Sequence, residues 1–190
     1  MRRTILALVG AAIFAGSTGI ARADKYSDAL DSFRKAGESS KFMSSAYGYA
    51  LFPTVGKGGI GIGGAYGKGR VYQGGKVIGT TTLTQASVGF QLGGQAYSQI
   101  IFFEDAHTLQ EFTKGNFEFG ADASAVIITA GATATAGTKG ASASASTEKK
   151  DAGTAGTYYK GMAVFTIVKG GAMYELSIAG QKFTYKAGGH

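Results

Sequence analysis

The sequence predicts an α+β protein that is mainly β. We expect an antiparallel, twisted or partly closed, barrel-like sheet with N-terminal helices and one internal helix packed on it. Most of the chain after residue 58 alternates with a period of two, as strands do. Helical periodicity is confined to two places, near residues 24–46 and 105–114. Helices and strands therefore do not alternate regularly, which argues against a parallel α/β sheet.

Residues 1–23 have the pattern of a cleavable signal peptide. Arg2 and Arg3 precede an apolar run of about ten residues, short of the roughly 20 that a spanning helix needs. The small residues of Ala21-Arg22-Ala23 predict cleavage between Ala23 and Asp24, and hence a periplasmic or secreted protein. A retained membrane anchor is the alternative. Residues 24–190 are then expected to form a single domain.

Charge and cysteine content exclude several classes of protein. Removal of the leader takes away three arginines and leaves a net charge of (19 − 3) − 12 = +4, which is only mildly basic. The chain has no cysteine, so disulfides and thiolate metal sites are excluded. The sequence also predicts no enzyme, cofactor or metal site, because His107 and His190 are its only histidines and no G-x-S-x-G motif occurs.

The N-terminal part predicts two helices. Tyr26, Ala29, Leu30 and Phe33 form one apolar stripe over residues 24–36, and Gly37 is expected to end that helix. A short second helix is expected from about residue 39. An extended segment at 49–52 is then expected to end at Pro53.

Glycine dominates the next segment, with eight glycines in residues 56–69. Ile60, Ile62 and Tyr66 predict one strand with an apolar face. Because Lys68 and Arg70 would continue that face, we expect a turn or bulge at residues 67–69. A hairpin is expected at 71–78, turning at 73–75. Residues 80–84 are expected to continue the returning strand of that hairpin, and further strands are expected at 88–92 and 95–103.

Asp105 is expected to cap a helix that runs to about Lys114 and ends at Gly115. Alternation over 117–125 and the apolar residues 126–128 predict more extended structure. Residues 130–157 are built of Ala, Gly, Thr and Ser and predict a low-complexity loop or a thin hairpin. The last expected strands are 162–168, 172–178 and 182–185.

Several segments resemble the SYLF family, also called the Ysc84 actin-binding or DUF500 family, in the family's order. They are YGYALFP (47–53), GGIGIGGAYGKG (58–69), VGFQLGGQ (88–95), IIFF (100–103), FGADA (119–123) and YYKG (158–161). The resemblance implies phospholipid binding for an exported bacterial member. The chain departs from eukaryotic members because it lacks their Trp-Ser-x-Pro segment and has no tryptophan. Actin binding is therefore not carried over.

The candidate lipid-binding residues are basic and aromatic side chains of the glycine-rich region. Residues 39–103 contain no Asp or Glu, so positive charge there is not balanced locally. The candidates are Lys57, Lys68, Arg70, Lys76, Tyr66 and Tyr72. The expected partner is an anionic phospholipid or membrane surface of the cell envelope and not nucleic acid, with the oligomeric state left open.

A second interpretation of these basic residues stays open. The basic residues could be solvated lysines on strand edges, which discourage aggregation. The protein would then be an envelope structural or protein-interaction module without specific lipid binding.

Gly59, Gly61 and Gly64 match the spacing of a dinucleotide fingerprint. That fingerprint needs a helix directly after the glycines, and a strand is expected here.

Overall fold

The computed structural model describes residues 24–60, 62–88, 94–121, 123, 125–128, 158–170 and 178–188. The expected leader (1–23) and the low-complexity segment (130–157) lie outside the described residues. So do 89–93 and 171–177, and with them most of two expected strands.

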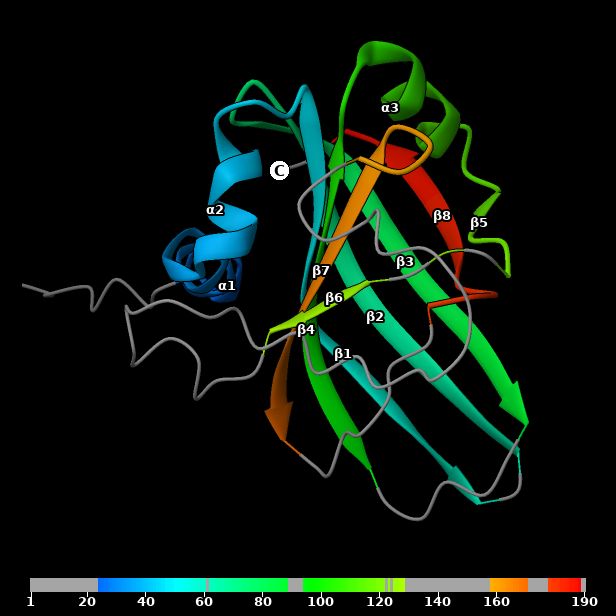
Figure 1. Cartoon of the computed structure of the whole chain (residues 1–190). Helices are drawn as coiled ribbons and strands as arrows, with labels where there is room; N and C mark the ends of the chain where they lie inside the picture. The colour runs from blue at the N-terminus through cyan, green and yellow to red at the C-terminus, as the bar shows by residue number, and fades with distance from the viewer. Residues whose placement is uncertain are drawn as a thin grey trace, which may run out of the picture.

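The described strands form one eight-stranded sheet in the order β5-β8-β3-β2-β1-β4-β7-β6, curled into a half-barrel (Figure 1). The strands are β1 (Gly48–Ile60), β2 (Ile62–Gln73), β3 (Lys76–Val88), β4 (Gln95–Phe103), β5 (Phe117–Glu118), β6 (Val126–Ile128), β7 (Met162–Gly170) and β8 (Lys182–Ala187). Every neighbouring pair is antiparallel except β6 and β7, which are parallel. The expected mainly β, antiparallel and partly closed fold is confirmed.

Helices α1 (Lys25–Lys35) and α2 (Gly37–Met43) pack on one side of the sheet, which we call the outer face (Figure 1). Asp24 caps α1, and its side chain accepts a hydrogen bond from the Tyr26 amide at 3.4 Å. The predicted stripe is confirmed, since Tyr26, Ala29 and Phe33 are buried. Gly37 does not merely end the first helix. It begins the second, after an extended Ala36.

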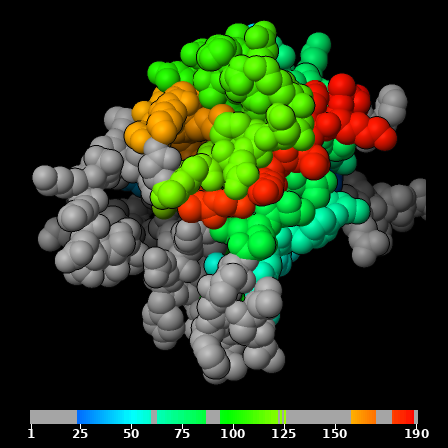
Figure 2. Space-filling model, turned by 90° about the vertical axis from the view of Figure 1, so that its right-hand side faces the viewer, coloured from blue at the N-terminus to red at the C-terminus, as the bar shows by residue number. Residues whose placement is uncertain are grey.

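The opposite, inner face carries an aromatic core beneath α3 (Ala106–Thr113). Phe112 of α3 lies 4.9 Å from Phe103 and 5.2 Å from Phe183, measured between ring centroids. In the space-filling view, the green side chains of α3 and the segment after it lie above the red ones of β8 (Figure 2). This contact closes one end of the half-barrel.

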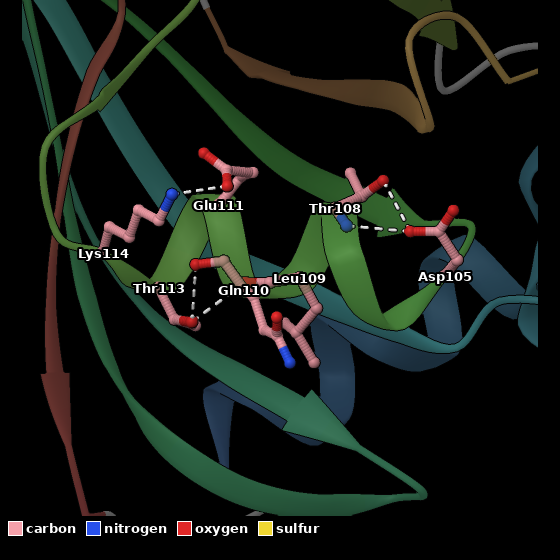
Figure 3. A network of polar contacts seen from close by, with 7 residues as sticks. All are labelled: Asp105, Thr108, Leu109, Gln110, Glu111, Thr113 and Lys114. Carbon is pink, nitrogen blue, oxygen red and sulfur yellow. Dashed lines mark hydrogen bonds and ion pairs between the residues drawn. The ribbon is translucent and has the colours of Figure 1, made fainter.

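The sequence signals for α3 are confirmed in detail (Figure 3). The Asp105 carboxylate accepts hydrogen bonds from the Thr108 amide at 2.8 Å and the Thr108 hydroxyl at 2.9 Å. These hydrogen bonds lower the pKa of Asp105. Gly115 follows the helix with φ +85°, a conformation that glycine adopts without strain.

Two expectations for the glycine-rich region are wrong. Pro53 does not end a strand, because β1 passes through it by an irregularity between Leu51 and Val55. Its carbonyl accepts a hydrogen bond from the Ser98 hydroxyl at 2.7 Å. The chain reverses at residues 60–62, where Ile60 pairs with Ile62, so the single strand expected there is two strands.

The turn or bulge expected at residues 67–69 is also absent. β2 pairs with β3 in unbroken register from Ile62 to Val71, so Lys68 and Arg70 share a face with Tyr66 after all. The part of that face that α1 and α2 do not cover is polar. Charged side chains can therefore lie on it, and no turn is needed to keep them off an apolar face. The hairpin at 73–76 is confirmed, with Gly74 and Gly75 at φ +55° and +77°.

Close packing across the strands explains the glycines of β2. A Cβ on Gly67 would lie 2.8 Å from Val55 Cγ2, and one on Gly69 would lie 2.7 Å from Phe52 Cδ1. Both glycines face inward, where the large side chains of β1 cross over β2. Gly67 and Gly69 therefore make room for the core, and they lie within a strand and not in a loop around a ligand.

Candidate functional site

One part of the outer face is not covered by α1 and α2, and it is rich in lysine and threonine. It lies on β2, β3 and β8, where strand pairing aligns three cross-strand rows. The rows are Arg70–Thr80–Lys186, Lys68–Thr82–Thr184 and Tyr66–Thr84–Lys182. We call these nine residues the Lys/Thr face. Directly paired residues of an antiparallel sheet project to the same side, so each row presents its side chains together.

Exposure confirms that the Lys/Thr face meets solvent. Tyr66 is 52% exposed, and Lys68, Lys182 and Lys186 are all exposed. Along β8 the exposed residues alternate with the buried Phe183, whose ring points into the inner core. The sheet here thus has one apolar and one polar side.

Two of the four cations on this face have carboxylate partners. Arg70 Nη1 lies 2.7 Å from Asp24 Oδ2, and Lys182 Nζ lies 3.6 Å from Glu118 Oε2. Within the part of the chain that the structure describes, no ion pair involves Lys68 or Lys186. These two lysines therefore carry the uncompensated positive charge of the surface.

Arg70 is held more firmly than the lysines. Its Cζ lies 4.0 Å from the centroid of the Tyr26 ring, a cation–π contact with helix α1. Partial burial lowers the pKa of Arg70, but hydrogen bonds to Asp24 and Tyr72 outweigh it, and the net shift is upward. The guanidinium therefore stays charged while it joins β2 to the start of α1.

The structure brings together three of the six residues that the sequence singled out: Tyr66, Lys68 and Arg70. Tyr72 shares their side of β2 but lies beneath α1, where it is only 9% exposed. Its ring stacks on that of Tyr49, with 4.7 Å between centroids. Tyr72 is therefore part of the core in this structure.

Lys57 and Lys76 lie elsewhere. Lys57 is 7% exposed and follows Val55 on the inner face of β1. Lys76 is exposed, but it stands at the β2–β3 turn, paired with Gln73. Neither residue is among the rows of the Lys/Thr face.

Sequence reasoning missed Lys182, Lys186 and the threonines. Part of the signal was present, since residues 182–186 alternate Lys and Thr with Phe183 and Tyr185, whereas residues 80–84 have Leu83 as their one apolar residue. The sequence does not show that β3 pairs with β8, because the two segments lie about a hundred residues apart in the chain. That pairing places the C-terminal lysines beside Lys68 and Arg70.

The inner face has its own polar cluster, formed by Tyr97, Gln99 and Gln181. The Gln99 amide donates to Gln181 Oε1 at 2.9 Å, and Gln181 Nε2 donates to the Tyr97 hydroxyl at 3.2 Å. Burial raises the pKa of Tyr97, so its phenol stays neutral. These groups satisfy one another and tie β4 to the residues before β8.

The described residues contain no group of three or more His, Cys, Asp or Glu side chains that could hold a metal ion. Among the same residues, no helix is both long enough and apolar enough to cross a membrane. The Lys/Thr face thus presents cations and hydroxyl groups on one side of the sheet.

Comparison with known proteins gives a family match. The family model Ysc84, described as "Las17-binding protein actin regulator", matches residues 84–187, which is more than half of the chain. The chain belongs to the Ysc84 (SYLF) family. This is a family of binding domains associated with lipid or actin. A search of curated proteins finds no match. The Ysc84 match includes β8 with Lys182 and Lys186, whereas Lys68 and Arg70 precede it.

Proposed function

We propose that this Ysc84-family chain is a non-enzymatic protein that binds anionic phospholipid headgroups through the Lys/Thr face. The observation that carries the proposal is the convergence of Lys68, Lys186 and Arg70 with the exposed Tyr66 on one open sheet surface. Each basic residue near an anionic membrane surface contributes about 1 kcal/mol of attraction. A tyrosine ring is favoured at the depth of the headgroups.

The threonines make the surface suitable for phosphate. Thr80, Thr82 and Thr84 each present a hydroxyl between a residue of β2 and a residue of β8. A hydroxyl can donate to a phosphate oxygen, and the neighbouring ammonium or guanidinium supplies the opposite charge. The face thus offers rows of mixed donors to an array of headgroups.

The cellular site proposed for this binding is the bacterial envelope. The signal-peptide pattern of residues 1–23 supports export to the periplasm or beyond. Export would keep the chain away from cytosolic actin, so lipid is the partner we propose from the two that the family suggests.

Vesicle flotation tests the proposal. The double variant Lys68→Gln/Lys186→Gln should bind vesicles of phosphatidylglycerol and phosphatidylcholine roughly thirtyfold more weakly than the unmodified chain, from about 1 kcal/mol for each lysine. The matched control is Lys41→Gln/Lys76→Gln, which removes two exposed lysines outside the face. Binding of the unmodified chain should fall with added salt and be weak on pure phosphatidylcholine.

Equal loss in the two double variants would contradict a site on the Lys/Thr face and indicate only a net-charge effect. Binding that ignores salt and vesicle charge would contradict the electrostatic mechanism. The absence of any vesicle binding would favour the protein-interaction module instead.

A further inference from the structure

Arg70 stands where the covered and open parts of the outer face meet, and it takes part in both. Through strand pairing it begins the row that continues with Thr80 and Lys186. Through its side chain it bonds to Asp24 at 2.7 Å and lies over the Tyr26 ring. One residue therefore links the Lys/Thr face to the first turn of α1.

Asp24 divides its two carboxylate oxygens between these partners. Oδ1 accepts the Tyr26 amide, which caps the helix, and Oδ2 accepts the Arg70 guanidinium. The start of α1 is thus docked on the sheet by a carboxylate–guanidinium pair, together with the Tyr26 ring.

A phosphate group would bind the same guanidinium donors of Arg70 that Asp24 binds. The guanidinium fork fits carboxylate and phosphate oxygens in the same geometry, so the two anions compete for it. Side chains paired across neighbouring strands lie about 5 Å apart at Cβ, which sets Arg70 and Lys186 on either side of the Thr80 hydroxyl. A phosphate above Thr80 would gain two cations, whereas Asp24 pairs with only one of them.

We infer that Asp24 is an internal competitor for phosphate at Arg70, so that headgroup binding on the Lys/Thr face releases the start of helix α1. This inference rests on the proposed function. The exchange is feasible because the pair is partly solvated, with side-chain exposures of 29% for Arg70 and 47% for Asp24. Exposed ion pairs of this kind contribute little to stability.

The first test is the variant Asp24→Asn. Asparagine caps a helix as well as aspartate does, so the substitution keeps the cap and removes the competing charge. The matched control is Asp28→Asn, which makes the same change of net charge in the same helix. Asp28 forms no ion pair within the described part of the chain. Asp24→Asn should bind phosphatidylglycerol vesicles about fivefold more tightly than Asp28→Asn. Equal affinities of the two variants would overturn the inference.

The second test is hydrogen–deuterium exchange of the α1 amides with and without vesicles. In the unmodified chain, anionic vesicles should speed exchange in the first turn of α1, and neutral vesicles should not. In Asp24→Asn, which keeps the cap but has no carboxylate for a headgroup to displace from Arg70, anionic vesicles should change exchange in the first turn of α1 little. Unchanged exchange in the unmodified chain at saturating anionic vesicles would overturn the inference.

The same exchange experiment with inorganic phosphate in place of vesicles identifies the source of the competing anion. Faster exchange with vesicles alone assigns the competition to headgroups in a bilayer. Faster exchange with both assigns it to phosphate from either source, and both results support competition at Arg70.

Failure of this inference can be distinguished from failure of the proposed function. If the unmodified chain does not bind anionic vesicles, the proposed function is wrong. If it binds them through Lys68 and Lys186 but Asp24→Asn behaves as Asp28→Asn does, only the role of Asp24 is wrong.

Discussion

The outer face of the sheet has two halves that differ in composition and share strand β2. In the covered half, α1 and α2 pack over aromatic and aliphatic residues of β1, β2, β4 and β7. In the open half, β2, β3 and β8 present lysine and threonine. The change takes place along one side of β2, from Tyr66 at 52% exposed to Tyr72 at 9%. Arg70, between them, belongs to both halves.

The comparison shows how a sheet can keep part of one face open to solvent. Threonine is β-branched and favours extended structure, yet its hydroxyl offers little apolar area for a helix to bury. Thr80, Thr82 and Thr84 thus stabilise β3 as a strand without attracting a covering element. The boundary between the halves is then set by the side chains that α1 and α2 can bury.

The largest expected effect comes from deleting a side chain in the covered half. Phe102 is fully buried, and its ring lies 5.6 Å from Phe42 of α2 and 5.9 Å from Phe165. Phe102→Ala should lower the free energy of unfolding by about 3–5 kcal/mol, because the cavity left behind cannot fully collapse. Urea unfolding followed by circular dichroism measures the change.

The counterpart in the open half is Thr84→Ala, at an exposed position of the Lys/Thr face. It should change the free energy of unfolding by no more than about 0.5 kcal/mol. A loss comparable to that of Phe102→Ala would show that the open half is packed against something in solution, and the contrast between the halves would fail.

A smaller effect should distinguish the two sides of the β1–β2 hairpin. Gly69 faces inward, where a new Cβ would lie 2.7 Å from Phe52 Cδ1 and 2.8 Å from the Leu51 carbonyl oxygen. Gly69→Ala should therefore cost about 1–3 kcal/mol of folding stability through strain in the packed core. Thermal or urea unfolding measures the cost.

Gly56 is the matched control, because it lies on the outer face opposite Tyr66 with nothing within 4 Å of a Cβ. Gly56→Ala should be neutral or stabilise the protein by up to about 1 kcal/mol, since alanine loses less chain entropy on folding. Equal destabilisation by both substitutions would mean that the glycines serve backbone flexibility and not packing.

Much of the fold could be predicted from local patterns. The apolar stripe of α1, the cap at Asp105, the Gly74–Gly75 turn and the apolar β4 each depend on neighbouring residues, and the structure has all of them. The errors arose where a local signal was outweighed by packing. Pro53 is accommodated by an irregularity in β1, and the glycines at 67 and 69 admit core side chains from the neighbouring strand.

The candidate site could be predicted only in part, for a related reason. Alternation along one strand would group Tyr66 with Lys68, but we expected a turn between them, because alternation does not say which side of the sheet a helix will cover. Tyr72 therefore looked available when it is buried. The contribution of β8 depends on a pairing between distant segments, which local sequence patterns do not encode. Lys57 lies on the inner face because the irregularity between Leu51 and Val55 changes which residues of β1 face inward.

The smallest expected effect is the part of an alkaline loss of stability that the covered half contributes, in addition to the part from Tyr97 on the inner face. Burial raises the pKa of Tyr26, Tyr49 and Tyr72. A phenol whose pKa is higher in the folded state than its unfolded value of about 10 contributes stability that is complete below pH 10 and is lost as the pH rises through the folded pKa. The urea midpoint should therefore be lower at pH 11 than at pH 8, with the fall beginning near pH 10.

Tyr49→Phe should make that fall smaller, because it removes one partly buried phenol whose ionisation opposes folding. Urea unfolding of the unmodified chain and of Tyr49→Phe at pH 8 and pH 11 measures the difference. An equal fall of the urea midpoint in both chains would show that the burial of Tyr49 next to Tyr72 does not contribute to the alkaline loss.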